Sequence, residues 1–120
     1  MTRILAVDDS PSMRDMVRIA LSGAGFQVTQ AADGAEALEI ARKDSFDLVL
    51  SDVNMPRMDG ISLIRALRAE TAYKHTPILM LTTESSAERK REGKDAGATG
   101  WIVKPFDPEQ LVATMQRVLR

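Results

Sequence analysis

The sequence predicts an α/β fold in which five parallel strands form a doubly wound sheet covered by helices on both faces. Two observations lead to this prediction. Short apolar runs typical of strands alternate with stretches of helical spacing, and the connections between them are short. Such alternation favours a parallel sheet, because consecutive parallel strands need a helical crossover. The chain has 120 residues, the size of one domain, so we expect residues 1–120 to form a single domain.

Five short runs are predicted as strands. They cover Arg3–Val7, Gln27–Ala31, Leu48–Leu50, Ile78–Leu81 and Trp101–Val103. Five strands in a chain of this size favour the flavodoxin-like order 2-1-3-4-5, in which the first and third strands flank the point where the winding reverses. Ligands of such folds bind at that point, beyond the carboxyl ends of the strands.

Capping residues mark the starts of three predicted helices. Ser10 followed by Pro11 is typical of an N-cap and a first helical position. Asp33 with Glu36 three residues later has the spacing of a capping box, and Asp107–Gln110 repeats it. These signals place a helix directly after the first, second and fifth strands.

One predicted helix is weaker than the others. The stretch Ser85–Gly97 carries few apolar residues and has Gly93 in its interior. An interior glycine costs about 1 kcal/mol relative to alanine. The stretch is interpreted either as a solvated surface helix or as a helix that moves during function.

Composition excludes several classes of function. The chain has no cysteine, which removes disulfides, thiolate metal sites and a cysteine nucleophile. His75 is its one histidine, so a metal site with several histidine ligands is excluded. The net charge is −1, and no basic run indicates nucleic-acid binding. No apolar run approaches the roughly 20 residues of a membrane span, and the start of the chain lacks a signal-peptide core, so we expect a cytoplasmic protein that does not bind membranes.

Polar side chains follow four of the five predicted strands at their carboxyl ends. They are Asp8, Asp9, Asp52, Thr82, Thr83 and Lys104. Taken singly, each has an ordinary interpretation, because aspartate caps helices and forms turns, threonine favours strands, and lysine is commonly exposed. Because the carboxyl ends of parallel strands meet at one edge of a sheet, we expect the three carboxylates, the hydroxyls and the ammonium group to converge.

This group of side chains predicts a divalent cation site that supports phosphoryl transfer. Two carboxylates about 4 Å apart repel by roughly 1 kcal/mol in water, so a positive partner is expected for Asp8 and Asp9. Oxygen ligands suit Mg²⁺, with Mn²⁺ as an alternative. Asp52 is the expected nucleophile toward phosphorus, because its strand lies between those of the acidic pair and Thr82. Lys104 would help neutralise the charge of the transferred group.

Four motifs resemble those of the receiver domains of bacterial two-component response regulators. They are VDDS (residues 7–10), LVLSDVNMPRMDG (48–60), LMLTTE (79–84) and VKPF (103–106). The resemblance extends over the whole chain. It is closest to stand-alone chemotaxis receivers of the CheY type, so a receiver domain without an output domain is expected.

The resemblance implies a role for each carboxylate. Asp52 matches the phosphorylated aspartate, and Asp8 and Asp9 match the acidic pair that holds Mg²⁺ together with Asp52. Asn54 matches the position whose backbone carbonyl binds the metal. Receivers of this family catalyse only their own phosphorylation and dephosphorylation, so a turnover enzyme is not expected.

The resemblance also implies a switch. Thr82 matches the switch hydroxyl, and Lys104 matches the phosphate-binding lysine, whose peptide bond to Pro105 is typically cis. In such receivers a histidine kinase supplies the phosphoryl group. The surface formed by the fourth helix, the fifth strand and the fifth helix then changes shape for a downstream partner.

Two positions depart from the common pattern of the family. Trp101 stands where tyrosine or phenylalanine is usual, and it is interpreted either as a permanently exposed partner anchor or as a packed residue at the strand edge. Thr83 stands where a smaller residue is preferred and could narrow access to the phosphate. Asn54 and Glu84 occupy two positions that tune hydrolysis and resemble the fast-cycling chemotaxis type.

The expected partners follow from the same resemblance. A histidine kinase of the CheA type is the implied donor, and a flagellar motor switch protein is the favoured downstream partner. The alternative is a phosphate sink or relay receiver in a phosphorelay outside motility. A monomer is the default expectation.

Three other classes of function compete with this interpretation. A Mg²⁺ phosphohydrolase usually has a second acid two residues after its nucleophile, and here that position is Asn54. A flavodoxin-like cofactor binder needs a phosphate-binding loop after the first strand, but the DDSPSM stretch is acidic. A scaffold that signals without phosphate does not need the complete set of acids, threonine and lysine.

Overall fold

The computed structural model describes residues 2–83 and 87–119. Its strands are β1 (Arg3–Val7), β2 (Gln27–Ala31), β3 (Leu48–Asp52), β4 (Ile78–Thr82) and β5 (Gly100–Val103). Its helices are α1 (Pro11–Gly23), α2 (Gly34–Lys43), α3 (Gly60–Arg68), α4 (Ala87–Ala96) and α5 (Pro108–Val118), with a short 3₁₀ helix, η1 (Thr71–Tyr73). All five predicted strands are present, and β3, β4 and β5 are one or two residues longer than expected.

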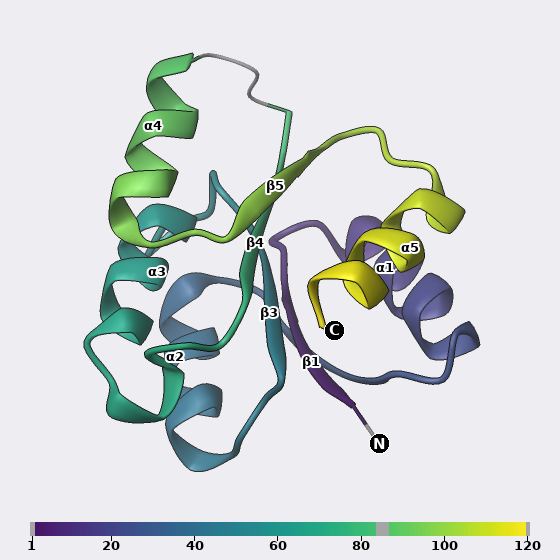
Figure 1. Ribbon diagram of the computed structural model, residues 1–120, viewed down its shortest axis with the longest axis horizontal. Helices are drawn as coiled ribbons and strands as arrows, with labels where there is room; N and C mark the ends of the chain where they lie inside the picture. Colours follow the sequence, from purple (N-terminus) through teal and green to yellow (C-terminus); the bar gives the residue numbers. More distant parts are fainter. Residues whose placement is uncertain (1, 84–86, 120) are drawn as a thin grey trace.

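The five strands form one parallel sheet in the order β2-β1-β3-β4-β5, which confirms the predicted doubly wound α/β fold. The register pairs Val7 with Ser51, Asp52 with Leu81, and Thr82 with Val103. The carboxyl ends of β1, β3, β4 and β5 are therefore aligned at one edge. Helices α1 and α5 cover one face of the sheet, and α2, α3 and α4 cover the other (Figure 1).

Each face of the sheet carries its own apolar core. Along β1, Ile4 and Ala6 pack with α1 and α5, whereas Leu5 and Val7 pack with α2 and α3. This alternation is expected for a strand, because successive side chains point to opposite faces. Every residue of the neighbouring strands β3 and β4 is buried, which fixes the central strand ends firmly.

The helix starts follow the predicted caps, with one difference. Ser10 Oγ accepts a hydrogen bond from the Met13 amide, and Asp33 accepts one from the Glu36 amide. At the start of α5 the Asp107 side chain accepts a hydrogen bond from the Glu109 amide and not from the Gln110 amide, so the capping-box bond predicted there is wrong. Asp107 is nevertheless the N-cap, and α5 begins at Pro108.

Helix α4 is packed more tightly than its sequence suggests. Gly93 is buried, and a Cβ atom at this position would lie 2.4 Å from Sδ of Met80 in β4. The glycine therefore lets the helix approach the sheet, so the interpretation of α4 as only a solvated helix is incomplete. The residues before Ala87 that were included in this predicted helix, Ser85 and Ser86, lie outside the described part of the chain.

Candidate functional site

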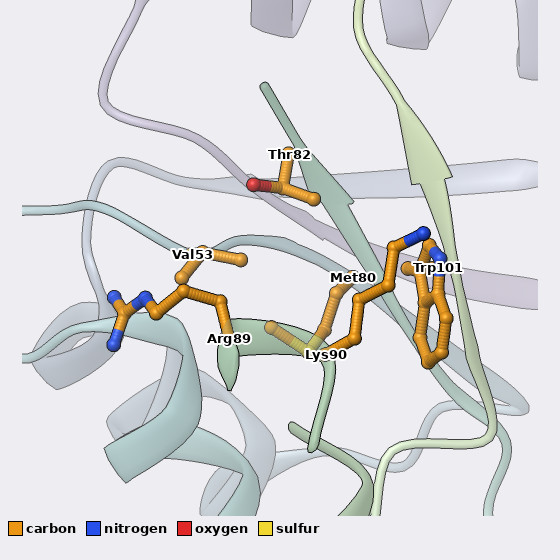
Figure 2. Close-up of a pocket in the computed structure, with 6 residues that line it drawn as sticks. All are labelled: Val53, Met80, Thr82, Arg89, Lys90 and Trp101. Carbon is orange, nitrogen blue, oxygen red and sulfur yellow. The ribbon is translucent and has the colours of Figure 1, made fainter. Parts of the chain in front are cut away.

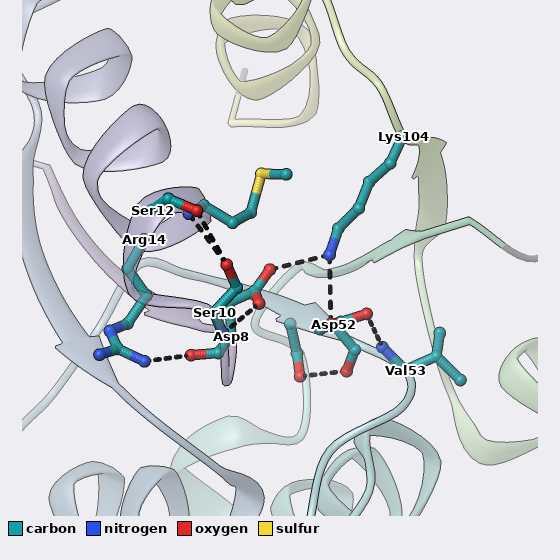
Figure 3. A network of polar contacts seen from close by, with 9 residues as sticks. Asp8, Ser10, Ser12, Arg14, Asp52, Val53 and Lys104 are labelled. Atoms are coloured by element: carbon teal, nitrogen blue, oxygen red, sulfur yellow. Dashed lines mark hydrogen bonds and ion pairs between the residues drawn. The ribbon is translucent and has the colours of Figure 1, made fainter.

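An ammonium group joins two carboxylates at the carboxyl edge of the sheet. Lys104 Nζ lies 2.9 Å from Oδ2 of Asp8 and 3.2 Å from Oδ2 of Asp52 (Figure 3). All three side chains are at most 12% exposed. These residues come from the ends of β1, β3 and β5, so the parallel sheet brings together groups that are 52 and 96 positions apart in sequence.

The turn after β1 fixes Asp8. Its amide donates to the carbonyl of Ala31 in β2, which continues the strand pairing by one residue. Its Oδ1 accepts the amide of Ser10, and its carbonyl accepts a hydrogen bond from Arg14 at 2.7 Å. The Oδ2 atom is therefore aimed at Lys104, while the neighbouring Asp9 is exposed.

The loop after β3 fixes Asp52. Oδ1 of this residue accepts the Val53 amide at 2.7 Å, and the Gly60 amide donates to the Val53 carbonyl at 2.8 Å. A Cβ atom at position 60 would lie 2.2 Å from the carbonyl oxygen of Asp52. Only glycine fits so close to this carbonyl oxygen, which explains why Gly60 ends the LVLSDVNMPRMDG motif.

The site shifts the acidity of its members. Burial, together with the charge of Asp8, raises the pKa of Asp52, although Lys104 acts in the opposite direction. Burial acts to lower the pKa of Lys104, but the hydrogen bond to Asp8 and the charges of both aspartates outweigh it and raise that pKa. Lys104 is therefore held as a cation, and Asp52 is a poorly solvated carboxylate.

The arrangement fits a hard divalent cation. Carboxylate oxygens of Asp8, Asp9 and Asp52 all lie within 4.8 Å of one another. One ammonium group faces these three acids, which leaves negative charge that Mg²⁺ would neutralise through oxygen ligands. The expected positive partner of the acidic pair is thus in part Lys104, which contacts Asp8 directly. Asn54 lies in the loop two residues beyond Asp52, with an exposed side chain.

The remaining predicted residues lie around this group. Thr82 is the buried last residue of β4, and its carbonyl accepts the Lys104 amide at 2.8 Å. Thr83 follows it and is exposed. The Lys104–Pro105 peptide bond is cis, as the resemblance implied. Glu84 lies outside the described residues.

Comparisons with known proteins agree with this geometry. Residues 4–116 match the response regulator receiver domain. The chain belongs to this family. Chemotaxis protein CheY-3 of Vibrio cholerae is 43% identical over 117 residues, which cover 97% of this chain and 90% of the relative. Some curated relatives are longer proteins, such as response regulator MprA of Mycobacterium leprae, which is 43% identical over 98% of this chain, and the chain spans about half of their length.

Solved receiver structures superpose closely on this receiver domain. Chemotaxis response regulator CheY4 of Vibrio cholerae is 58% identical, with a TM-score of 0.94 and 98% of each chain covered. The receiver domain of the sensor histidine kinase PA1611 of Pseudomonas aeruginosa is 30% identical, with a TM-score of 0.92, covering 98% of this chain and 97% of that one. That structure has a magnesium ion coordinated in its active site cleft.

Beside the acidic site, the receiver domain has a small hollow that contains Trp101. It is lined by Val53, Met80, Thr82, Arg89, Lys90 and Trp101 (Figure 2). Trp101 is 36% exposed, and Lys90 Nζ lies 5.1 Å from the centre of the Trp101 ring, so this residue is both partly exposed and packed. Thr82 belongs to the acidic site and also lines this hollow.

Two arginines near the site were missed by sequence reasoning. Arg89 in α4 donates to Oδ1 of Asn54 at 3.2 Å, and Arg57 in the loop after β3 pairs with Asp33 at 3.0 Å. The partners are separated by 35 and 24 positions, and a single exposed arginine carries no signal of such pairing.

In the described part of the chain, no helix is long and apolar enough to span a membrane.

Proposed function

We propose that this receiver domain accepts a phosphoryl group on Asp52 from a phosphohistidine of a histidine kinase. The observation that supports it best is the bridge from Lys104 Nζ to Asp8 and Asp52, at 2.9 and 3.2 Å, within a cluster of three carboxylates. Such a cluster would be a poor binding site for an organic anion. It suits a cation that a transferred phosphoryl group shares.

The transfer breaks one bond and forms another. A carboxylate oxygen of Asp52 attacks phosphorus, the P–N bond of the phosphohistidine breaks, and the imidazole leaves with the bonding electrons. Burial removes water from around the Asp52 carboxylate, and the Val53 amide orients it. Lys104 moves from the carboxylate to an oxygen of the new phosphoryl group and offsets its charge.

The metal would be held by Asp8, Asp9 and Asp52, and by the backbone carbonyl of Asn54. When bound, Mg²⁺ would neutralise the negative charges that otherwise keep the carboxylates and the phosphoryl oxygens apart. In a separate step, water attacks the phosphorus of the aspartyl phosphate, the bond between phosphorus and the Asp52 oxygen breaks, and inorganic phosphate is released as the carboxylate is restored. We therefore propose that the domain catalyses only its own phosphorylation and dephosphorylation.

Phosphorylation of Asp52 would change the surface formed by α4, β5 and α5, to which a downstream partner binds. Thr82 connects the two regions, because it borders the acidic site and lines the hollow beside Trp101. A charge added at Asp52 favours the conformation in which the Thr82 hydroxyl contacts it, and the neighbouring α4 and Trp101 adjust to that conformation.

The biological setting is proposed from the relatives. The similarity to CheY-3 and CheY4 favours cytoplasmic control of chemotaxis, with a CheA-like kinase as donor and a flagellar motor switch protein as the partner of a monomeric receiver. The similarity to the receiver of a sensor histidine kinase favours the alternative of a phosphate sink or relay.

Intact mass spectrometry tests the phosphorylation. We expect acetyl phosphate with MgCl₂ to add one phosphoryl group to the chain, and EDTA to prevent it. Asp52→Asn should remain unmodified, while Asp95→Asn, which changes an exposed aspartate in α4, should be modified like the wild type. Modification of Asp52→Asn at the wild-type rate would overturn the assignment.

A further inference from the structure

We infer that Arg57 is a positioning residue for the metal site. Its ion pair with Asp33 holds the β3–α3 loop (residues 53–59) in the conformation that presents Asn54 to Mg²⁺. The inference rests on the proposed function, because it assumes that Mg²⁺ binds at Asp8, Asp9 and Asp52. Arg57 lies in the far limb of this loop, the part next to α3, whereas Asn54 lies in the near limb, next to β3. Arg57 would therefore join the residues that set the affinity of the site for Mg²⁺.

The backbone at Arg57 shows where the loop is constrained. Its φ angle is 68°, and among the described residues no other non-glycine residue has a positive φ. A side chain with a Cβ atom is disfavoured in this left-handed region and stays there only when surrounding contacts require it. The Met58 amide donates to the Pro56 carbonyl at 2.7 Å across this residue, which closes a tight local turn, and the side-chain contacts of Arg57 indicate what fastens that turn to the rest of the molecule.

Those contacts lead to the start of α2. Arg57 Nε lies 3.0 Å from Oδ2 of Asp33, and Arg57 Nη2 lies 3.2 Å from Oδ1, so the guanidinium spans both carboxylate oxygens. Asp33 is itself fixed, because it is buried and accepts the Glu36 amide as the N-cap of α2. A planar guanidinium is suited to this two-point contact.

The backbone fastens the same limb of the loop. The Gly34 amide donates to the Met58 carbonyl at 3.1 Å, and a Cβ atom at position 34 would lie 2.5 Å from that oxygen. The base of the loop is closed by the hydrogen bond from Gly60 to Val53. With its base closed and its far limb held on α2, the near limb, which contains Asn54, is restrained from both ends.

Two single substitutions separate this role from a simple charge effect. Arg57→Gln removes a positive charge near an acidic site, which by Coulomb attraction alone would strengthen Mg²⁺ binding. Asp33→Asn removes a negative charge, which alone would weaken it, and asparagine still caps α2. If the pair positions the loop, both substitutions weaken Mg²⁺ binding, and the double variant is no weaker than the single ones.

The measurement is a titration of isotope-labelled protein with MgCl₂, followed by amide chemical shifts. We expect Arg57→Gln to raise the dissociation constant by about tenfold, as for other groups that orient metal ligands. Arg57→Gly relieves the backbone and should leave the midpoint of urea unfolding unchanged or higher, yet it should also bind Mg²⁺ more weakly.

A matched control uses the other end of α2. Arg42 pairs there with Glu70, and Arg42→Gln should bind Mg²⁺ like the wild type. The positioning role is overturned if Arg57→Gln binds Mg²⁺ as tightly as the wild type or more tightly, or if Arg42→Gln loses as much affinity. A wild-type protein that takes up no Mg²⁺ would instead overturn the proposed metal site, and the role of Arg57 with it.

Discussion

Asp52 is held in an environment that does not favour its charge. Burial and the neighbouring Asp8 raise the pKa of its carboxyl, and Lys104 offsets only part of this effect. Between the pKa of the unfolded chain and the raised pKa of the folded protein, the folded state binds more protons, so stability falls as the pH rises through this interval. Such a cost is typical of a residue that is kept for its chemistry.

We predict that Asp52→Asn makes the protein more stable. The substitution removes a buried charge while Lys104 keeps its contact with Asp8, so the free energy of unfolding at neutral pH should rise by about 1 kcal/mol. Urea unfolding in EDTA would measure this change. The gain should shrink in acid, where Asp52 itself is protonated, and a less stable variant at neutral pH would contradict the prediction.

The site residues were partly predictable from the sequence. Asp8, Asp52 and Lys104 could be placed together because each follows a strand, and parallel strands end at the same edge. The arginines Arg57 and Arg89 could not be, since their partners depend on how the loops fold over the sheet. The sequence also did not show that Lys104 would contact both carboxylates, which requires side-chain geometry.

At the scale of single elements, α4 shows how packing can reverse a local preference. Gly93 is unfavourable in a helix, and the sequence alone suggested weakness or motion. The structure supplies a steric reason, because the helix lies so close to Met80 that a Cβ atom would overlap its sulfur. The distance between a helix and its sheet cannot be deduced from helical spacing.

We predict that the effect of Gly93→Ala depends on Met80. In the wild type, contact with the methionine should remove the gain of about 1 kcal/mol that alanine normally gives in a helix. In a Met80→Ala background the contact is gone, so the same substitution should become more favourable by about 1 kcal/mol or more. Urea unfolding of the four proteins measures this coupling, and equal effects in both backgrounds would disprove the steric explanation.

The start of β1 is fastened at the edge opposite the site. The Arg3 guanidinium pairs with the Asp44 carboxylate, donates to the Ser45 carbonyl and lies 5.0 Å from the centre of the Phe46 ring. The hydrogen bonds from Arg3 lower the pKa of Asp44 from 3.8 to about 2. This contact joins β1 to the connection between α2 and β3.

A pH dependence follows from the lowered pKa. The pair stabilises the fold at pH values above the ordinary pKa of Asp44, and this contribution is lost as the pH falls from 3.8 to about 2. Arg3→Gln should return the pKa of Asp44 toward 3.8, measured by NMR titration of its carboxyl group. An Asp44 that still titrates near 2 in the variant would show that another group lowers its pKa.

At the scale of the whole molecule, the residues that stabilise the sheet and the polar residues of the site occupy different parts of the strands. The central strands β3 and β4 are fully buried and stabilise the fold, while the polar groups lie at the carboxyl ends of β1, β3, β4 and β5. This arrangement was predictable, because alternating strands and helices predict a parallel sheet, and the carboxyl ends of parallel strands lie at one edge. The proposed response of the surface at α4 and β5 is implied only by the resemblance to the family, because its extent depends on the energies of two packed states.

The central claim is that phosphorylation at the sheet edge changes the surface beside it. Trp101 is the one tryptophan of the chain, so its fluorescence reports on that surface alone. We predict that acetyl phosphate with MgCl₂ changes this fluorescence at the same rate as the intact mass increases, and that Asp52→Asn shows neither change. A phosphorylated protein with unchanged fluorescence, or a fluorescence change that persists in Asp52→Asn, would contradict the claim.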